Sequence, residues 1–175
     1  NLFGYGAPGD HKWIMVDIGV TFADDTIPGV DLIYPDPGFI VERKENLLGI
    51  ILTHAHEDHI GAIAHLWPKL QCKIFATPFT ALLIREKFKE KHIDITNDLT
   101  IVELNGSVKL EPFDIEYITL THSILEPNGL RIQTPAGIIL HTGDWKVDPN
   151  PLIGDNINSK RLKEIGEEGV LAMIC

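Results

Sequence analysis

Short apolar runs alternate with turns and helical patterns in the first half of the chain. The run over 48–53 is apolar almost throughout, which is typical of a strand covered on both faces. Thr77-Pro78 predicts the start of a helix, because threonine suits the N-cap and proline suits the first helical position. The three prolines between positions 28 and 37 exclude their segment from a central sheet. The expected elements are strands over 13–17, 48–53 and 73–76, and helices over 60–70 and 78–92.

Strands dominate the second half of the chain. Asn105-Gly106 and the Pro-Ala-Gly tripeptide over 135–137 supply turns between apolar runs. The expected elements are a helix over 158–168 and strands over 100–104, 108–110, 113–120, 130–134, 138–141 and 170–175. The whole pattern predicts the α/β (α+β) class, with mixed or antiparallel sheets covered by helices.

The composition is that of a globular protein. A chain of 175 residues, with 44% hydrophobic and 23% charged residues, fits one domain or a large part of one. No apolar stretch approaches the roughly 18 residues that a membrane span needs, and no signal peptide is visible. Two cysteines are too few for a disulfide scaffold. We therefore expect a cytoplasmic protein that does not interact with a membrane.

The charge balance restricts the kind of partner. The chain has 15 basic and 25 acidic residues, for a formal net charge of −10. This excess of acid disfavours nucleic-acid binding through a broad basic face. It does not exclude an enzyme whose positive charge is concentrated in bound metal ions. The basic residues over 85–91 alternate with glutamates, which favours a solvated helix face over an RNA track.

The two ends of the sequence suggest a part of something larger. There is no initiator methionine, and residues 169–175 predict a buried strand with no polar tail after it. Domains rarely stop on an unpaired apolar strand, because an apolar edge would be exposed. We therefore expect residues 1–175 to be the N-terminal part of a longer protein.

The segment THAHEDH over 53–59 carries the strongest chemical signal. It directly follows the buried strand, so its side chains lie at a strand end. Imidazole nitrogens and carboxylate oxygens are the ligands of zinc and similar divalent ions. His54 and His56 can converge on one ion, while Asp58 and His59 suit a second ion beside it. One histidine alone would more often be structural, but four potential ligands in this register predict a metal site.

Two distant segments offer the further ligands that a two-ion site needs. His122 follows the strand expected over 113–120, and Asp144 follows the one over 138–141. Ligands at strand ends gather at one edge of a sheet, the usual place for sites in α/β folds. His141 shares a segment with Asp144, where a supporting role is favoured over a direct ligand role.

The pattern H-x-H-x-D-H, followed by a distant histidine and a distant aspartate, resembles the metallo-β-lactamase fold. The segments VDIG (16–19), PGVD (28–31), LTHAHEDHIGA (52–62) and HTGDWK (141–146) are together similar to the ribonuclease J family of the β-CASP branch. This resemblance implies a metallo-β-lactamase-like sandwich of mixed β-sheets covered by helices, incomplete here. It also implies that the β-CASP insertion, the final histidine ligand and a phosphate-binding segment lie beyond residue 175.

The resemblance implies a role for each side chain of the site. Asp58 and His59 would hold one ion. His54, His56 and His122 would hold the other, and Asp144 would bridge both ions. Asp58 is also the implied catalytic residue, because its carboxylate can orient or deprotonate a water. The implied metal ligands are therefore His54, His56, Asp58, His59, His122 and Asp144.

Asp17 and His141 are the residues expected to support the ligands from behind. Asp17 resembles the aspartate that ends an early strand in the family and orients the site. From the sequence alone, a polar residue that caps a turn is an equally good interpretation of Asp17. A direct metal-ligand role for His141 is the less favoured of its two interpretations.

The resemblance implies two Zn²⁺ ions per complete site, with Mn²⁺ as an alternative, and RNA as the substrate of endonucleolytic or 5′ exonucleolytic cleavage. Homo-oligomers are plausible for the complete protein. Another hydrolase of the same fold, acting on a thioester or a lactam, stays open because fold does not determine function. A third class comprises an iron-dependent oxidoreductase and a degenerate, non-catalytic domain. The oxidoreductase branch typically has glutamate in place of His56, and every ligand position within reach is filled, so this class is disfavoured.

Overall fold

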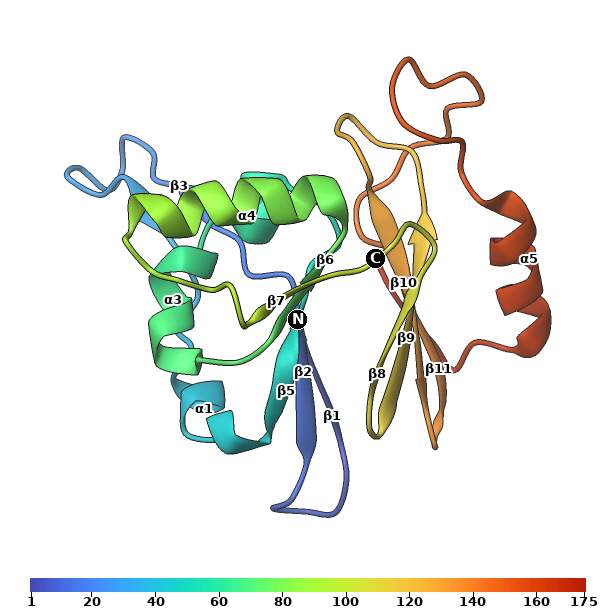
Figure 1. The fold of residues 1–175 in the computed structure, drawn as a ribbon, viewed down its shortest axis with the longest axis horizontal. Helices are drawn as coiled ribbons and strands as arrows, with labels where there is room; N and C mark the ends of the chain where they lie inside the picture. Colours follow the sequence, from blue (N-terminus) through green and yellow to red (C-terminus); the bar gives the residue numbers. More distant parts are fainter.

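Two five-stranded sheets face each other in the computed structural model, which describes residues 1–175 (Figure 1). In the first sheet β1 is antiparallel to β2 and all other neighbours are parallel. Its order is β1 (Leu2–Tyr5), β2 (Lys12–Val16), β5 (Leu47–Ile51), β6 (Ile74–Ala76) and β7 (Leu99–Ile101). The second sheet is antiparallel except for its β11–β12 pair. Its order is β12 (Ala172–Ile174), β11 (Gly137–His141), β10 (Asn128–Thr134), β9 (Phe113–Thr119) and β8 (Ser107–Leu110).

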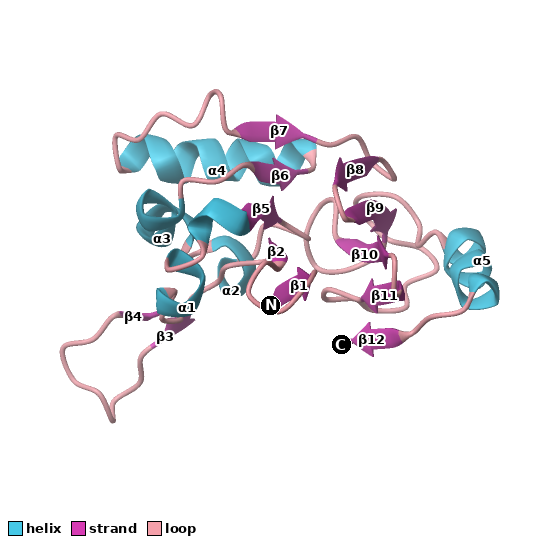
Figure 2. Cartoon of the chain, turned by 90° about the horizontal axis from the view of Figure 1, so that it is seen from below, coloured by secondary structure: helices cyan, strands magenta, loops and turns pink.

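Helices cover the outer face of each sheet (Figure 2). The first sheet is covered by α1 (Gly38–Val41), α3 (Ile63–Leu70) and α4 (Pro78–Glu90), and the second by α5 (Ser159–Glu168). The remaining elements are a hairpin of β3 (Thr21–Phe22) and β4 (Leu32–Ile33), a 3₁₀ turn at Lys44–Asn46, and the short α2 (Glu57–Ile60). None of these helices has the length and apolar character needed to cross a bilayer.

The alternation of side chains along the strands produces two cores on opposite faces of the first sheet. Ile14 and Val16 point between the sheets, whereas Met15 points toward the helices. The core between the sheets is tied by a buried hydrogen bond, because the Tyr117 hydroxyl donates to the Phe75 carbonyl at 3.0 Å. The predicted sandwich of mixed sheets covered by helices is therefore confirmed.

Several local details differ from the sequence-based expectation. The strand β1, the β3–β4 hairpin and the short α2 were not predicted. The helix expected over 60–70 begins three residues later, as α3 (Ile63–Leu70). Thr77 does occupy the N-cap position of α4, but its buried hydroxyl makes no hydrogen bond. The final strand is largely exposed, with Met173 60% accessible, because β12 pairs with β11 on one side only.

The chain from Ile18 to Val20 runs against the α2 turn and connects the metal-ligand motif to the first sheet. Ile18 donates its backbone N–H to His59, and Val20 donates to Glu57. Between them, a Cβ atom on Gly19 would overlap the backbone carbonyl of Asp58. Glycine at position 19 therefore permits the close approach that locates this end of the motif.

Gly19→Ala should therefore destabilise the protein by about 2–3 kcal/mol, the usual cost of an overpacked contact. The measurement is the free energy of unfolding in denaturant. Gly166→Ala is the matched control, since a Cβ there meets no atom within 4 Å and α5 should gain up to about 1 kcal/mol. Equal stabilities of the two variants would contradict this account of Gly19.

Candidate metal centre

The ends of four strands bring the candidate ligands to one edge of the sandwich. Asp17 follows β2, and the motif histidines follow β5 in the first sheet. His122 follows β9 and Asp144 follows β11 in the second sheet. Because β9 and β11 both run antiparallel to β10, their carboxyl ends lie at the same edge. Neither sheet alone supplies the whole set.

Three imidazole rings converge at the centre of this edge. His56 Nδ1 lies 3.1 Å from His54 Nε2 and 3.2 Å from His122 Nε2. Tetrahedral zinc with Zn–N bonds of roughly 2.0–2.1 Å separates its nitrogen ligands by about 3.3 Å. The nitrogen separations in the structure are close to this value, so the three side chains fit a single divalent cation.

Asp17 holds two of the histidines in position through one carboxylate. Its Oδ1 accepts the Thr53 backbone N–H at 2.8 Å, and its Oδ2 accepts the Thr53 hydroxyl at 2.8 Å. Oδ2 also lies 2.8 Å from His59 Nδ1. The Thr53 hydroxyl in turn lies 3.0 Å from His54 Nδ1. Both Nδ1 atoms are thereby engaged, which leaves the Nε2 atoms of His54 and His59 directed into the site.

A second group of converging ligands lies beside the first. His54, His59 and Asp144 bring one ligand atom each within 4.8 Å of one another. Asp144 Oδ1 is 3.4 Å from His59 Nε2, and Asp144 Oδ2 is 3.7 Å from His122 Nε2. Asp144 therefore reaches toward both groups, as expected of a bridging ligand.

Asp58 occupies a different position from the other five expected ligands. Its Oδ2 lies 3.6 Å from His59 Nε2, but its side chain is 66% exposed and it belongs to neither converging group. The carboxylate instead lines a cleft of about 330 Å³ beside the site. Other residues of this cleft include Asn1, Asp17, His59, His141 and Asp144.

His141 is buried behind the site and both of its ring nitrogens have partners within the chain. Nδ1 accepts the Gly143 backbone N–H at 3.1 Å, and Nε2 lies 3.1 Å from the side-chain amide of Asn1. His141 is absent from both converging groups. Its contacts fit the supporting role that the sequence favoured over direct ligation.

Burial and neighbouring charges set the protonation states of the histidines. Burial, aided by the neighbouring His59, lowers the pKa of His54 to about 4, and burial also lowers the pKa of His122. For His59 burial acts in the same direction, but the hydrogen bond and charge of Asp17 outweigh it and raise the pKa. Neutral imidazoles are the form that binds metals, so the lowered pKa values of His54 and His122 favour cation binding by these two side chains.

Comparison with known proteins agrees with this geometry. A family model described as "Beta-lactamase superfamily domain" matches residues 12–160. The chain belongs to the β-lactamase superfamily. It is 47% identical to Ribonuclease J of Sinorhizobium meliloti over 99% of its own length and 40% identical to Ribonuclease J of Helicobacter pylori over 92%. The chain spans 31% and 24% of the length of these two relatives.

Solved structures share the superfamily fold at low sequence identity. A metallo-β-lactamase from Cronobacter sakazakii aligns with a TM-score of 0.56 at 16% identity, covering 90% of this chain and 62% of the other. Zn²⁺-bound PqqB from Methylobacterium extorquens aligns with a TM-score of 0.52 at 11% identity, covering 81% and 48%. These likenesses concern the fold alone.

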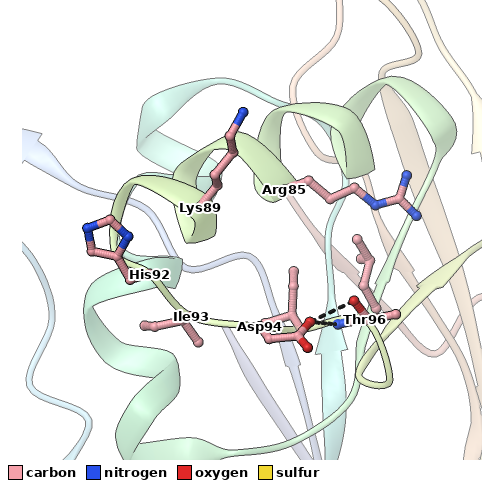
Figure 3. A pocket seen from close by; sticks show the side chains of 8 residues that line it. Arg85, Lys89, His92, Ile93, Asp94 and Thr96 are labelled. Carbon is pink, nitrogen blue, oxygen red and sulfur yellow. Dashed lines mark hydrogen bonds between the residues drawn. The ribbon is translucent and has the colours of Figure 1, made fainter.

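A second cavity lies away from the candidate metal centre. It is an open groove of about 620 Å³ between the C-terminal half of α4 and the segment that leads to β7 (Figure 3). Arg85, Lys89 and His92 line it, and Asp94 accepts hydrogen bonds from Thr96 within it. It contains none of the converging ligand groups.

Two residues that support the candidate metal centre, Thr53 and Asn1, were not predicted from the sequence. Thr53 connects Asp17 to His54, and its position directly before the first ligand is the signal that was available. Asn1 approaches His141 across a separation of 140 positions, for which no local pattern exists. Such long-range contacts become visible only in the folded chain.

The opposite pKa shifts predict an order of metal loss on acidification. A proton on His59 Nε2 competes with a cation, and its raised pKa makes this competition begin at higher pH than for His54 or His122. As the pH is lowered, Zn²⁺ should therefore leave the ligands around His59 first. Calorimetric zinc titrations at several pH values measure this order. Simultaneous weakening of both binding steps would contradict it.

Proposed function

We propose that this chain carries the metal centre of a ribonuclease that hydrolyses RNA phosphodiester bonds. The observation that carries the proposal is the convergence of His54, His56 and His122 nitrogens, with Asp144 beside them. Relatives named Ribonuclease J, matched over nearly the whole chain, favour RNA as the substrate. Cleavage within the RNA and removal of nucleotides from its 5′ end are both compatible with such a centre.

We propose two divalent ions, Zn²⁺ or alternatively Mn²⁺. His54, His56 and His122 would hold the first ion and Asp58 and His59 the second, with Asp144 as the ligand shared between them. When bound, such ions supply a water of lowered pKa and neutralise charge on phosphoryl oxygens. Asp58 and Asp144 offset only part of the charge of two divalent ions, so the site attracts phosphate despite the acidic chain.

The side chains divide the remaining work between orientation and proton transfer. Asp17 and Thr53 keep the Nε2 atoms of His54 and His59 directed toward the site. Asp58, exposed in the cleft, accepts the proton of the attacking water at its carboxylate. His141 stays buried behind Asp144 and holds the turn through Gly143.

A different hydrolase of this superfamily is the second candidate. The solved metallo-β-lactamase with the same fold favours it, because the fold supports several hydrolytic reactions. A thioester or a lactam would meet the same converging ligands. The higher identity to the Ribonuclease J relatives makes RNA the preferred substrate. We further propose that the protein acts in the cytoplasm and that its complete form is a homo-oligomer.

The double variant His54→Ala/His56→Ala should abolish metal-dependent cleavage of RNA in the full-length protein. It removes two of the three nitrogens that converge on one cation. Cleavage is measured on 5′- and 3′-labelled RNA, which separates internal cutting from 5′ trimming, and circular dichroism verifies the fold. His11→Ala/His92→Ala is the matched control, since these histidines lie outside both ligand groups and should leave cleavage unchanged. Undiminished cleavage by the His54/His56 variant would overturn the proposal, and turnover of a thioester or lactam without RNA cleavage would favour the second candidate.

A further inference from the structure

Asn128, at the start of β10, joins the two sheets behind the metal centre. Its side chain is 1% exposed. Its Nδ2 donates to the Thr53 carbonyl at 3.0 Å, and its backbone N–H donates to the same carbonyl at 3.1 Å. Thr53 immediately precedes His54, so both bonds act on the peptide that leads into the first ligand.

The same amide also holds the loop that carries His122. Asn128 Nδ2 donates to the Glu126 carbonyl at 2.7 Å, while Leu120 N–H and the Pro127 carbonyl close the base of the loop at 2.9 Å. His122 lies within the loop that the Leu120–Pro127 hydrogen bond closes, four residues before Glu126. One side-chain amide is thereby shared between the segment of His54 and the segment of His122.

A third ligand segment packs against the Asn128 backbone. Gly143, directly before Asp144, has φ +55°, and a Cβ there would lie 2.6 Å from the Asn128 carbonyl oxygen. The turn between His141 and Asp144 therefore rests against Asn128. Position 128 contacts all three parts of the chain that supply the proposed ligands.

Glu126 anchors the His122 loop on its other side. Its Oε2 accepts the backbone N–H of Phe79 at 2.8 Å, in the first turn of α4, where helical N–H groups have no partner within the helix. A carboxylate at this end of a helix is also favoured by the helix dipole. Glu126 thus attaches the His122 loop to α4, and Asn128 attaches it to the end of β5.

The orientation of the Asn128 amide follows from its donors. Nδ2 is shared by two carbonyl oxygens, while Oδ1 is buried without a hydrogen-bond partner. A flipped amide would direct Oδ1 at both carbonyls, which is unfavourable. The observed orientation keeps both donor bonds, so the NH₂ group is the part of the side chain that connects the two segments.

We infer that Asn128 is a positioning residue of the metal centre, which sets the spacing of His54 and His122 through the Thr53 carbonyl and the His122 loop, with Glu126 as its second anchor. The inference rests on the metal centre proposed above. Residues that orient metal ligands from behind typically contribute 10- to 100-fold to metal affinity.

The test is the Zn²⁺ affinity of the full chain, measured by competition with a chromophoric chelator. Asn128→Ala should weaken zinc binding by about tenfold, and the absorption bands of Co²⁺ bound in place of zinc should shift, since the ligand spacing changes. Glu126→Ala should weaken zinc binding by a smaller factor. Glu126→Gln should restore it, because the amide oxygen still accepts the Phe79 N–H.

Asn158→Ala is the matched control. Asn158 accepts the Arg161 N–H as the N-cap of α5, so loss of its side chain costs about 1 kcal/mol of stability, and its side-chain partners Arg161 and Asn105 lie outside the ligand segments. Zinc affinity should be unchanged in this variant. If Asn128→Ala lowers the unfolding midpoint as Asn158→Ala does, but leaves zinc affinity and the Co²⁺ spectrum unaltered, the inference is overturned.

Further outcomes are decisive as well. If Asn128→Ala does not fold, the comparison of Glu126→Ala with Glu126→Gln tests the inference instead. Equal zinc affinities of these two variants would overturn it. A wild-type chain that takes up no Zn²⁺ would refute the proposed metal centre itself. A wild-type chain that binds zinc, with variants that bind equally well, would refute only the positioning role.

Discussion

The carboxylate of Asp17 is the interaction on which the candidate site depends. It directly follows β2, has φ 59°, and receives the backbone and hydroxyl of Thr53 together with the ring of His59. A left-handed conformation is unfavourable for most residues and is tolerated by aspartate, whose short side chain bonds nearby backbone groups. Through one side chain, the end of β2 thereby determines which nitrogens of His54 and His59 face the converging ligands.

The division of ligands between two sheets makes the site a property of the sandwich. His54, His56 and His59 belong to the first sheet, while His122 and Asp144 belong to the second. Their separation depends on the core between the sheets, because close-packed interiors allow little relative movement. The Tyr117–Phe75 hydrogen bond and the Asn128–Thr53 bonds connect the same two layers at different depths. The spacing of the candidate ligands therefore depends on the packing of the hydrophobic core between the sheets.

The two ligand groups differ in chemistry. The first consists of imidazoles alone, and burial lowers the pKa of His54 and of His122. The second combines His59, whose pKa is raised, with the carboxylate of Asp144 and the exposed Asp58 nearby. Divalent ions bound at these ligands would concentrate positive charge at one edge of a chain whose formal net charge is −10.

The order of apolar runs was sufficient to predict the α/β class, and the THAHEDH segment was sufficient to predict a metal site after β5, because both depend on local spacing. The final strand was predicted, but its exposure and the separate α2 turn were not, since they depend on neighbours in space. The choice of ring nitrogens, the outward position of Asp58, and the contacts of Thr53 and Asn128 were decided only by the tertiary structure. The Asp17–Thr53 contact joins residues 36 positions apart, and the Asn128–Thr53 contact joins residues 75 positions apart. Local sequence patterns do not predict contacts over such separations.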